Sequence, residues 1–280
     1  MNEKNEHKQT EERFFLYIDI LNFSNLIRQR GKVEELYEII NKLNVHRHDV
    51  FTTIIFSDTI LVYNKPDAGN LHDVEYIVMY LCEFAQDLFY RLIGRDIHFR
   101  AYITCDEFAH YSMENIKDVF YGNALIEAYM AEKKIQAMGL FMSNRVVPYS
   151  NIFKTRRFNK ECHFVYIMQS LEDVSSSPLG NVNFRREDYP LPPILVVDTD
   201  VIWSVAYDIR YLQTIHGHRS NSALSSKVKQ KYERTWQLLF KQHSGLLSML
   251  EENAFDPKAV CQCDWTEPIG RVGTPNGCFG

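Results

Sequence analysis

Hydrophobic positions alternate between short strand-like runs and longer helical stripes along the first 170 residues. The aromatic and β-branched run RFFLYIDIL is typical of a strand that is buried on both faces. The predicted strands cover residues 13–21, 51–63 (two strands around a tight turn), 97–105, 139–143 and 163–170. The predicted helices cover residues 24–44, 70–93 and 123–137. Hairpins mix with crossovers in this order, so we expect an α+β protein with a mixed sheet.

The composition divides the chain into five parts. Polar residues 1–12 predict a flexible arm, and residues 13–170 carry the alternating elements, whose connectivity resembles a ferredoxin-like βαββαβ core with additions. Residues 171–193 are rich in Ser, Pro, Gly and charge, which suits a linker. Residues 194–264 predict a mostly helical C-terminal extension, and the Gly- and Pro-rich residues 265–280 predict a flexible tail.

Composition and charge exclude several classes of protein. Hydrophobic residues make up 45% and charged residues 24%, which is ordinary for a globular protein. The net charge of -5 shows no domain-wide basic excess, so we expect no nucleic-acid partner. The N-terminus is polar, and no apolar run approaches the ~18 residues of a membrane span. We therefore expect no membrane association. The six cysteines show no CxxC pair, which favours a reduced, cytoplasmic setting.

Two aspartates interrupt apolar strands, where a carboxylate must be paired, hydrogen-bonded or bound to metal. Asp19 lies inside FFLYIDIL, and Asp58 lies between TTIIF and TILVY. Taken singly, Asp58 fits a turn residue and Asp19 fits a helix cap. Taken together on adjacent strands, they predict a site for Mg²⁺ or Mn²⁺, with phosphate oxygens completing the shell.

Arg100 and Gly122 are further candidates for anion binding. Arg100 lies in the largely apolar strand IHFRAYIT, so its guanidinium needs an anion. That anion is either a protein carboxylate or a phosphate. Gly122 precedes a predicted helix, where it is either an ordinary loop glycine or a sharp turn that presents helix N–H groups to an anion.

These motifs resemble the class III nucleotidyl cyclases. Residues 17–24 (YIDILNFS) resemble the first metal motif of that family, in which Asp, Ile, two variable residues, Phe and Ser/Thr follow in order. FSDT, with Asp58, resembles the second metal motif, although Ser57 replaces the usual glycine. RAYIT, from Arg100, resembles the strand whose arginine holds the triphosphate, and residues 121–134 resemble the start of the next helix. The resemblance covers about residues 13–170.

The resemblance implies a mechanism and a shared active site. Two ions, Mn²⁺ or Mg²⁺, are expected per active site, held by Asp19, the backbone of Ile20 and Asp58. The catalytic residues would be Asp19, Asp58 and Arg100. The ribose 3′-oxygen would attack the α-phosphorus and release pyrophosphate. Two chains would form a head-to-tail homodimer with shared sites. Amides of residues 21–24 would cradle phosphate. The nucleotide-binding residues would be Phe23, Ser24, Ile54, Arg100, Val119, Tyr121 and Asn123.

The sequence departs from the family at the positions that read a purine base. Ile54 stands where adenylate cyclases carry a lysine, and Val119 stands where they carry an aspartate or threonine. The Glu and Cys of guanylate cyclases are also missing there. Because an apolar position cannot specify a polar base edge, ATP is disfavoured as the substrate.

The residues that stabilise the transition state are also replaced. The family's Asn and Arg would fall at Ile126 and Met130. Nearby polar replacements are Asn123, Glu127 and Tyr121. Candidates for the triphosphate lysine of the partner chain are Lys154, Arg156, Arg157 and Lys160.

The sequence keeps both metal aspartates and lacks the pair of residues that reads a purine base. In this respect it resembles one branch of the family, the pyrimidine cyclases of Pycsar antiphage defence. This resemblance implies conversion of UTP or CTP to the 3′,5′-cyclic nucleotide, which activates an antiviral effector. We place UTP ahead of CTP only because of the resemblance to this branch, since no residue of the sequence distinguishes the two nucleotides. The alternatives are a purine (adenylate or guanylate) cyclase and a catalytically inactive nucleotide-binding or dimerisation module.

Overall fold

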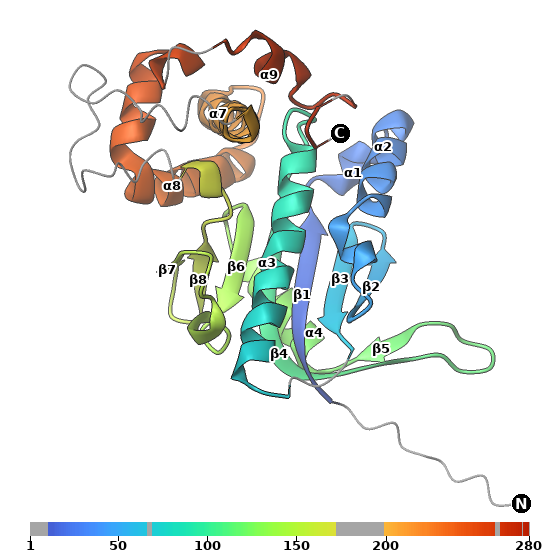
Figure 1. Ribbon diagram of the computed structural model, residues 1–280. Helices are drawn as coiled ribbons and strands as arrows, with labels where there is room; N and C mark the ends of the chain where they lie inside the picture. Colours follow the sequence, from blue (N-terminus) through green and yellow to red (C-terminus); the bar gives the residue numbers. More distant parts are fainter. Residues whose placement is uncertain (1–10, 66–68, 172–198, 261–263, 276, 280) are drawn as a thin grey trace, which may run out of the picture.

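A single mixed sheet of eight strands organises the protein (Figure 1). The computed structural model describes residues 11–65, 69–171, 199–260, 264–275 and 277–279. The strands are β1 (Glu11–Ile20), β2 (Phe51–Phe56), β3 (Thr59–Asn64), β4 (Phe99–Tyr111), β5 (Val119–Tyr121), β6 (Gly139–Ser143), β7 (Thr155–Arg157) and β8 (Cys162–Val165). Their order is β2-β3-β1-β4-β6-β8-β7, and β5 pairs separately with β4.

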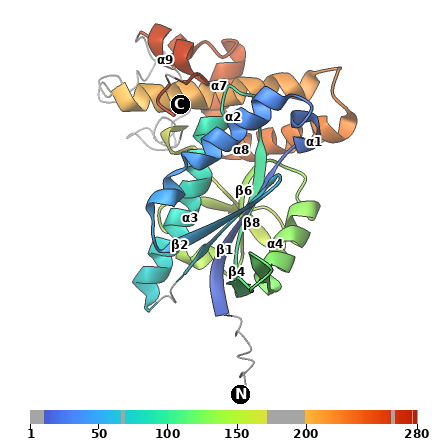
Figure 2. The same cartoon turned by 90° about the vertical axis from the view of Figure 1, so that its right-hand side faces the viewer.

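Helices cover both faces of the sheet and one of its ends. The sheet lies between α3 and α4 (Figure 2). The helices are α1 (Phe23–Leu26), α2 (Arg30–Asn41), α3 (Leu71–Leu92), α4 (Asn123–Lys134), α7 (Thr199–Ser220), α8 (Ser226–Glu252) and α9 (Thr266–Arg271). Helix α3 is capped at its N-terminus by the Asn70 side chain, whose amide oxygen accepts a hydrogen bond from the Asp73 backbone amide. Among the described residues, no helix has the length and hydrophobicity needed to cross a bilayer.

The predicted α+β class and ferredoxin-like core are confirmed by the strand order. Strands β1, β2, β3 and β4 are the four strands of a βαββαβ unit, with α2 and α3 as its helices. They lie in the order β4-β1-β3-β2 and are antiparallel throughout. The addition of β6 parallel to β4 makes the sheet mixed. The register places the end of β1 beside the start of β4.

The C-terminal helices pack on the end of the sheet at which β1 finishes (Figure 1). The Met138 amide donates to the Thr235 hydroxyl of α8 at 2.8 Å, and the Tyr166 hydroxyl donates to the Leu238 carbonyl at 3.1 Å. The rings of Phe89 in α3 and Tyr211 in α7 pack edge to face, with centroids 4.6 Å apart. The mostly helical extension is therefore confirmed, and it shares a core with the sheet domain.

Several predicted boundaries need correction. Strand β4 continues to Tyr111, where a loop was expected, because its distal residues pair with β5. Strands β5 and β7 were missed, and the run 163–170 leaves strand conformation after Val165. The stripe over 24–44 divides into α1 and α2. Most of the expected arm (1–10) and linker (172–193) lies outside the described residues.

The tail over residues 265–280 also differs from its prediction of flexibility. It contains α9, and the Trp265 side chain is buried. The Phe279 ring stacks on Tyr90 of α3 with centroids 4.7 Å apart. The aromatic residues between the glycines and prolines therefore give this segment enough apolar surface to pack.

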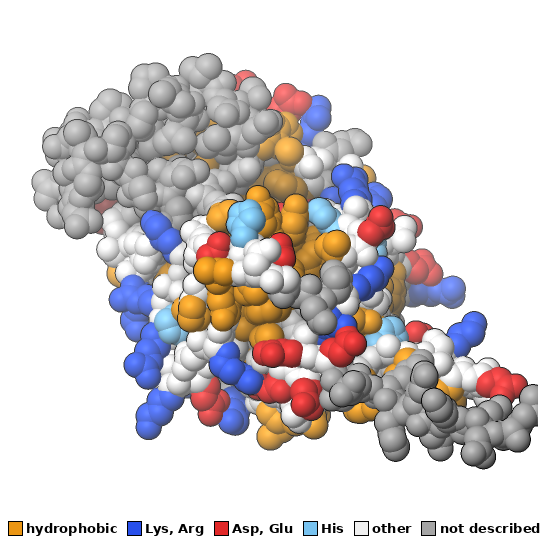
Figure 3. All heavy atoms as spheres, turned by 60° about the horizontal axis from the view of Figure 1, so that its bottom comes forward, with side chains coloured by type: hydrophobic (Ala, Val, Ile, Leu, Met, Phe, Trp, Pro, Cys, Tyr) orange, Lys and Arg blue, Asp and Glu red, His pale blue; other side chains and the backbone are white. Residues whose placement is uncertain are grey.

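The end of the molecule away from the helical extension has a mixed surface. Figure 3 shows hydrophobic side chains gathered in the middle of this face, with acidic and basic side chains around them. The hairpin from β4 to β5 extends from the same end (Figure 1) and carries the exposed Met113 and Ile116.

Candidate active site

Asp19 and Asp58 meet at one end of the sheet. Asp19 is the penultimate residue of β1, where it pairs with Thr59 of β3 on one side and Arg100 of β4 on the other. Asp58 immediately precedes Thr59 in the turn from β2 to β3. The Ile20 amide donates to the Asp58 carbonyl at 2.8 Å, which ties this turn to the end of β1. The fold thus brings together the carboxylates that the sequence singled out.

The surroundings of Asp19 favour a cation beside it. Burial raises the pKa of its carboxyl from 3.8 to about 6, and the Asp58 charge adds to the rise, while Arg100 and Lys231 oppose it. A half-buried carboxylate beside a second carboxylate gains from a divalent ion, which replaces lost hydration and offsets their repulsion. The residues present therefore fit a hard, oxygen-binding metal such as Mg²⁺ or Mn²⁺.

Arg100 is held by protein carboxylates. Its side chain is buried, pairs with Glu132 of α4 and lies 3.7 Å from Asp19. The guanidinium also donates to the Ile135 carbonyl. Of the two partners that the sequence left open, the structure contains the carboxylate pair. Glu132 was missed, because one glutamate in a charged helix gives no signal that it faces a buried arginine on another element.

A lysine of the helical extension also belongs to this site. Lys231 of α8 lies close enough to Asp19 and Arg100 for their charges to interact. Burial, and then the Arg100 charge, lowers the pKa of its ammonium group. Sequence reasoning missed Lys231, because it is one of several lysines in an amphipathic helix whose docking depends on the fold.

The expected phosphate cradle is only partly available. The Leu21 amide donates to the His98 carbonyl at 2.8 Å, so its inclusion among the phosphate-binding amides was wrong. Asn22 adopts the left-handed conformation (φ 62°) ahead of α1. Within α1, Phe23 is buried and Ser24 is exposed. The use of Ile20 as a backbone ligand stays a prediction.

The positions predicted to read the base lie on strands β2 and β5. Ile54 is buried in β2, and Val119 and Tyr121 lie on β5. Strand β5 pairs with the distal part of β4 from Ala109 to Tyr111. At a rise of about 3.3 Å per residue, this is about 30 Å along β4 from Arg100. One chain therefore does not bring β5 to the aspartates, and the roles of these residues stay predictions.

The start of α4 lies at the same distal end. Asn123, its first residue, is exposed, and its side chain hydrogen-bonds to Asp106 of β4. Gly122 has φ 150°, and a Cβ there would lie 2.2 Å from the Glu107 carbonyl oxygen. The backbone turns sharply at Gly122, where only glycine allows this close approach to β4, and presentation of the helix N–H groups to an anion stays a prediction.

The positions of the missing transition-state residues are open to solvent. Ile126 and Met130 on α4 are 62% and 49% exposed, so both present apolar surface outward. Glu127, a proposed replacement, accepts from the Thr104 hydroxyl and pairs with Arg145. It is therefore already engaged within its own chain.

The proposed substitutes for the triphosphate lysine lie around β7, at the opposite edge of the sheet from β2. Strands β4, β6 and β8 separate β7 from β1. Arg156 donates to the Lys241 carbonyl at 2.9 Å, and Arg157 donates to the Asn159 carbonyl at 3.1 Å. Lys154 and Lys160 flank this strand. These cations do not reach the aspartates of their own chain.

Comparison with known proteins finds likeness in chain path only. No protein-family model and no curated protein matches the sequence. The adenylyl cyclase CyaB from P. aeruginosa is 12% identical, with a TM-score of 0.42 over 56% of this chain and 95% of its own. The guanylate cyclase domain of RhGC from Catenaria anguillulae, in complex with GTP, is 15% identical, with a TM-score of 0.41 over 56% and 96%. The guanylyl cyclase Cya2 is 15% identical, with a TM-score of 0.37 over 56% and 92%.

Proposed function

We propose that this protein is a nucleotidyl cyclase, which converts a nucleoside triphosphate to its 3′,5′-cyclic monophosphate and pyrophosphate. The observation that carries the proposal is the meeting of Asp19 and Asp58 at the end of β1, fixed by the bond between the Ile20 amide and the Asp58 carbonyl. A carboxylate whose pKa is raised by burial and by a like charge is typical of a functional site.

The two aspartates, with the Ile20 carbonyl, would hold two divalent ions, Mg²⁺ or Mn²⁺. Such ions activate the attacking oxygen and neutralise the leaving phosphates. The bond from O3′ to the α-phosphorus forms, the bond from that phosphorus to the bridging oxygen of pyrophosphate breaks, and the 3′-hydroxyl proton passes to solvent. Lys231 offers its ammonium group to the phosphates. Arg100 lies 3.7 Å from Asp19 and is the proposed phosphate contact of β4, for which its guanidinium would exchange Glu132 for a phosphate.

The proposed substrate is a pyrimidine nucleotide, UTP ahead of CTP. Ile54 and Val119 carry no hydrogen-bonding group in their side chains, so neither can read the polar edge of adenine or guanine. The order of UTP and CTP comes from the resemblance to pyrimidine cyclases of antiphage defence. In the same scheme, the product is a second messenger that activates a separate antiviral effector in the cytoplasm.

The proposed active form is a homodimer with shared active sites. In one chain the aspartates lie beside the start of β4, whereas β5 and the start of α4 lie at its far end. A head-to-tail partner would bring the two sets together. Ile126, Tyr129 and Met130 form an exposed apolar strip on α4 that a second chain could cover.

A second candidate function is a nucleotide-binding or dimerisation module without turnover. The exposure of Ile126 and Met130 favours it, since both stand where a cyclase of this class presents an asparagine and an arginine. The retention of Asp19 and Asp58 speaks against it, because a binding module does not need two carboxylates that repel each other.

Turnover by aspartate variants tests the proposal. Purified wild-type protein, Asp58→Ala and the surface control His72→Ala are incubated with UTP and Mn²⁺, and cyclic product is measured by chromatography. We expect wild-type rates in the control, whose imidazole is 72% exposed, and a loss of at least about 100-fold in Asp58→Ala. Full activity of Asp58→Ala overturns the two-metal assignment. UTP binding without product in every variant supports the module.

A further inference from the structure

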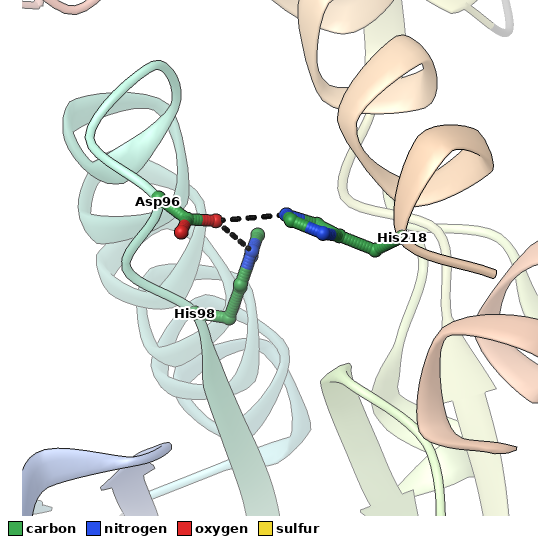
Figure 4. A group of neighbouring side chains, drawn as sticks. All are labelled: Asp96, His98 and His218. Atoms are coloured by element: carbon green, nitrogen blue, oxygen red, sulfur yellow. Dashed lines mark hydrogen bonds and ion pairs between the residues drawn. The ribbon is translucent and has the colours of Figure 1, made fainter. Parts of the chain in front are cut away.

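A group of three metal-ligating side chains lies outside the candidate active site, where the helical extension meets the sheet domain. Asp96 and His98 come from the loop between α3 and β4, and His218 comes from the last turn of α7 (Figure 4). One ligand atom from each residue lies within 4.8 Å of the others. In Figure 4 both imidazole rings point toward the Asp96 carboxylate.

One of the two contacts with Asp96 is a hydrogen bond, from His218, and the other, from His98, is longer and leaves a buried ring nitrogen unsatisfied among the described residues. Asp96 Oδ1 lies 3.0 Å from His218 Nε2 and 3.5 Å from His98 Nε2. Ligand atoms about 2.1 Å from a tetrahedral zinc ion lie about 3.4 Å from one another. The longer separation exceeds a good hydrogen bond. His98 Nε2 is buried, and it makes no geometrically sound hydrogen bond with the part of the chain that the structure describes.

The surroundings fix the rings and leave one side accessible. The ring of Tyr232 on α8 packs against His218 with centroids 4.7 Å apart and against His98 with centroids 5.5 Å apart. The imidazoles of His98 and His218 are 12% and 22% exposed, whereas the Asp96 side chain is 59% exposed. A cavity of about 540 Å³, lined by Asp96, Gln213 and His218, opens beside the group. An ion has a path of entry there and room for water as a fourth ligand.

We propose that Asp96, His98 and His218 bind a divalent transition metal ion, with Zn²⁺ as the best fit, and that this ion fastens the helical extension to the sheet domain. Two imidazole nitrogens and one carboxylate oxygen select zinc-like ions over Mg²⁺, which takes oxygen ligands. The ligands come from both parts of the chain, so binding joins them. The His98 carbonyl holds the Leu21 amide, two residues after Asp19, which places the joint beside the candidate active site.

Zinc binding by ligand variants tests this proposal without reference to nucleotide turnover. Full-length protein is stripped with a chelator and titrated with Zn²⁺ against a competing indicator dye. The ligand variants are Asp96→Asn and His218→Ala. Asn suits the left-handed backbone of residue 96 (φ 56°), so the first of these should fold. The controls are His72→Ala, which removes an exposed histidine, and Asp58→Asn, which alters the other candidate metal site.

We expect one tight zinc ion per chain in wild type and in both controls. Each ligand variant should bind it at least about 10–100-fold more weakly, since even the loss of an outer contact has that effect. At a free Zn²⁺ concentration of about 100 times Kd, the wild-type Tm should rise by about 5 °C or more, with no such rise in His218→Ala. Equal zinc affinity in wild type and His218→Ala overturns the proposal, as does loss of the tight ion in Asp58→Asn alone.

Discussion

Replacement of Asp19 by asparagine should stabilise the metal-free fold and weaken metal binding. The Asp19 side chain is 21% exposed, and burial raises the pKa of its carboxyl from 3.8 to about 6. At about 1.4 kcal/mol per pKa unit, the ionised group destabilises the metal-free fold by at most about 3 kcal/mol. Solvent screening reduces this to about 1–2 kcal/mol. Asp19→Asn should therefore raise the free energy of unfolding at pH 8 by that amount.

The sign of the pH dependence follows from the direction of the shift. The folded-state pKa of Asp19 lies above its unfolded value, so wild type loses stability relative to Asp19→Asn as pH rises from about 4 through about 6. The advantage of the variant should be larger at pH 8 than at pH 5. Urea unfolding followed by circular dichroism in EDTA measures it, with Asp58→Asn as a control that should change by less than about 1 kcal/mol.

Added Mn²⁺ should reverse the order of stability. At the proposed site the ion would bind the folded wild type and stabilise it, whereas Asp19→Asn would lack the carboxylate that holds it. An Asp19→Asn protein that is less stable than wild type at pH 8 in EDTA would refute the reasoning from burial. Equal stabilisation of both proteins by Mn²⁺ would refute the metal assignment.

Four further substitutions test other parts of the account. Lys231→Met should lower kcat/KM for the nucleotide by about tenfold or more with unchanged circular dichroism, because it removes the positive charge beside Asp19 that is proposed to contact phosphate; an unchanged kcat/KM would remove this residue from the site. Glu132→Gln should lower the free energy of unfolding by about 3 kcal/mol in urea, because it leaves a buried guanidinium without its nearest carboxylate. Gly122→Ala should destabilise by about 2 kcal/mol or more in the same assay, since the new Cβ would meet the Glu107 carbonyl. Burial raises the pKa of Asp208 to about 8, so the free energy of unfolding of wild type should fall from about pH 4 up to pH 8. Asp208→Asn should flatten this slope. Parallel pH profiles for wild type and Asp208→Asn would contradict the raised pKa of this carboxyl.

The sequence predicted the core elements because their signals are local. The apolar run before Asp19 and the paired runs around Asp58 were sufficient to place β1, β2 and β3. Strands β5 and β7, of three residues each, carry too little pattern to be seen, because their conformation depends on pairing with β4 and β8. The tail after residue 265 was read from its glycines and prolines, although Trp265 and Phe279 decide its packing.

The residues of the candidate site that lie in or beside apolar strands could be predicted from the sequence, whereas those on charged helices could not. Asp19, Asp58 and Arg100 stand out because charge is costly inside an apolar strand. Glu132 and Lys231 lie on helices rich in charge, where only tertiary packing distinguishes them from solvent-exposed neighbours. The partner of Arg100 therefore could not be chosen from the sequence, and the contribution of α8 could not be foreseen.

Direct assay of nucleotide turnover tests the central claim. Purified protein is incubated separately with ATP, GTP, CTP and UTP, with Mn²⁺ or Mg²⁺, and the products are separated by chromatography. The account predicts a cyclic pyrimidine nucleotide and pyrophosphate in equal amounts, formed only with metal. A cyclic purine product would contradict the interpretation of Ile54 and Val119. The absence of any cyclic product from all four nucleotides would contradict the cyclase itself.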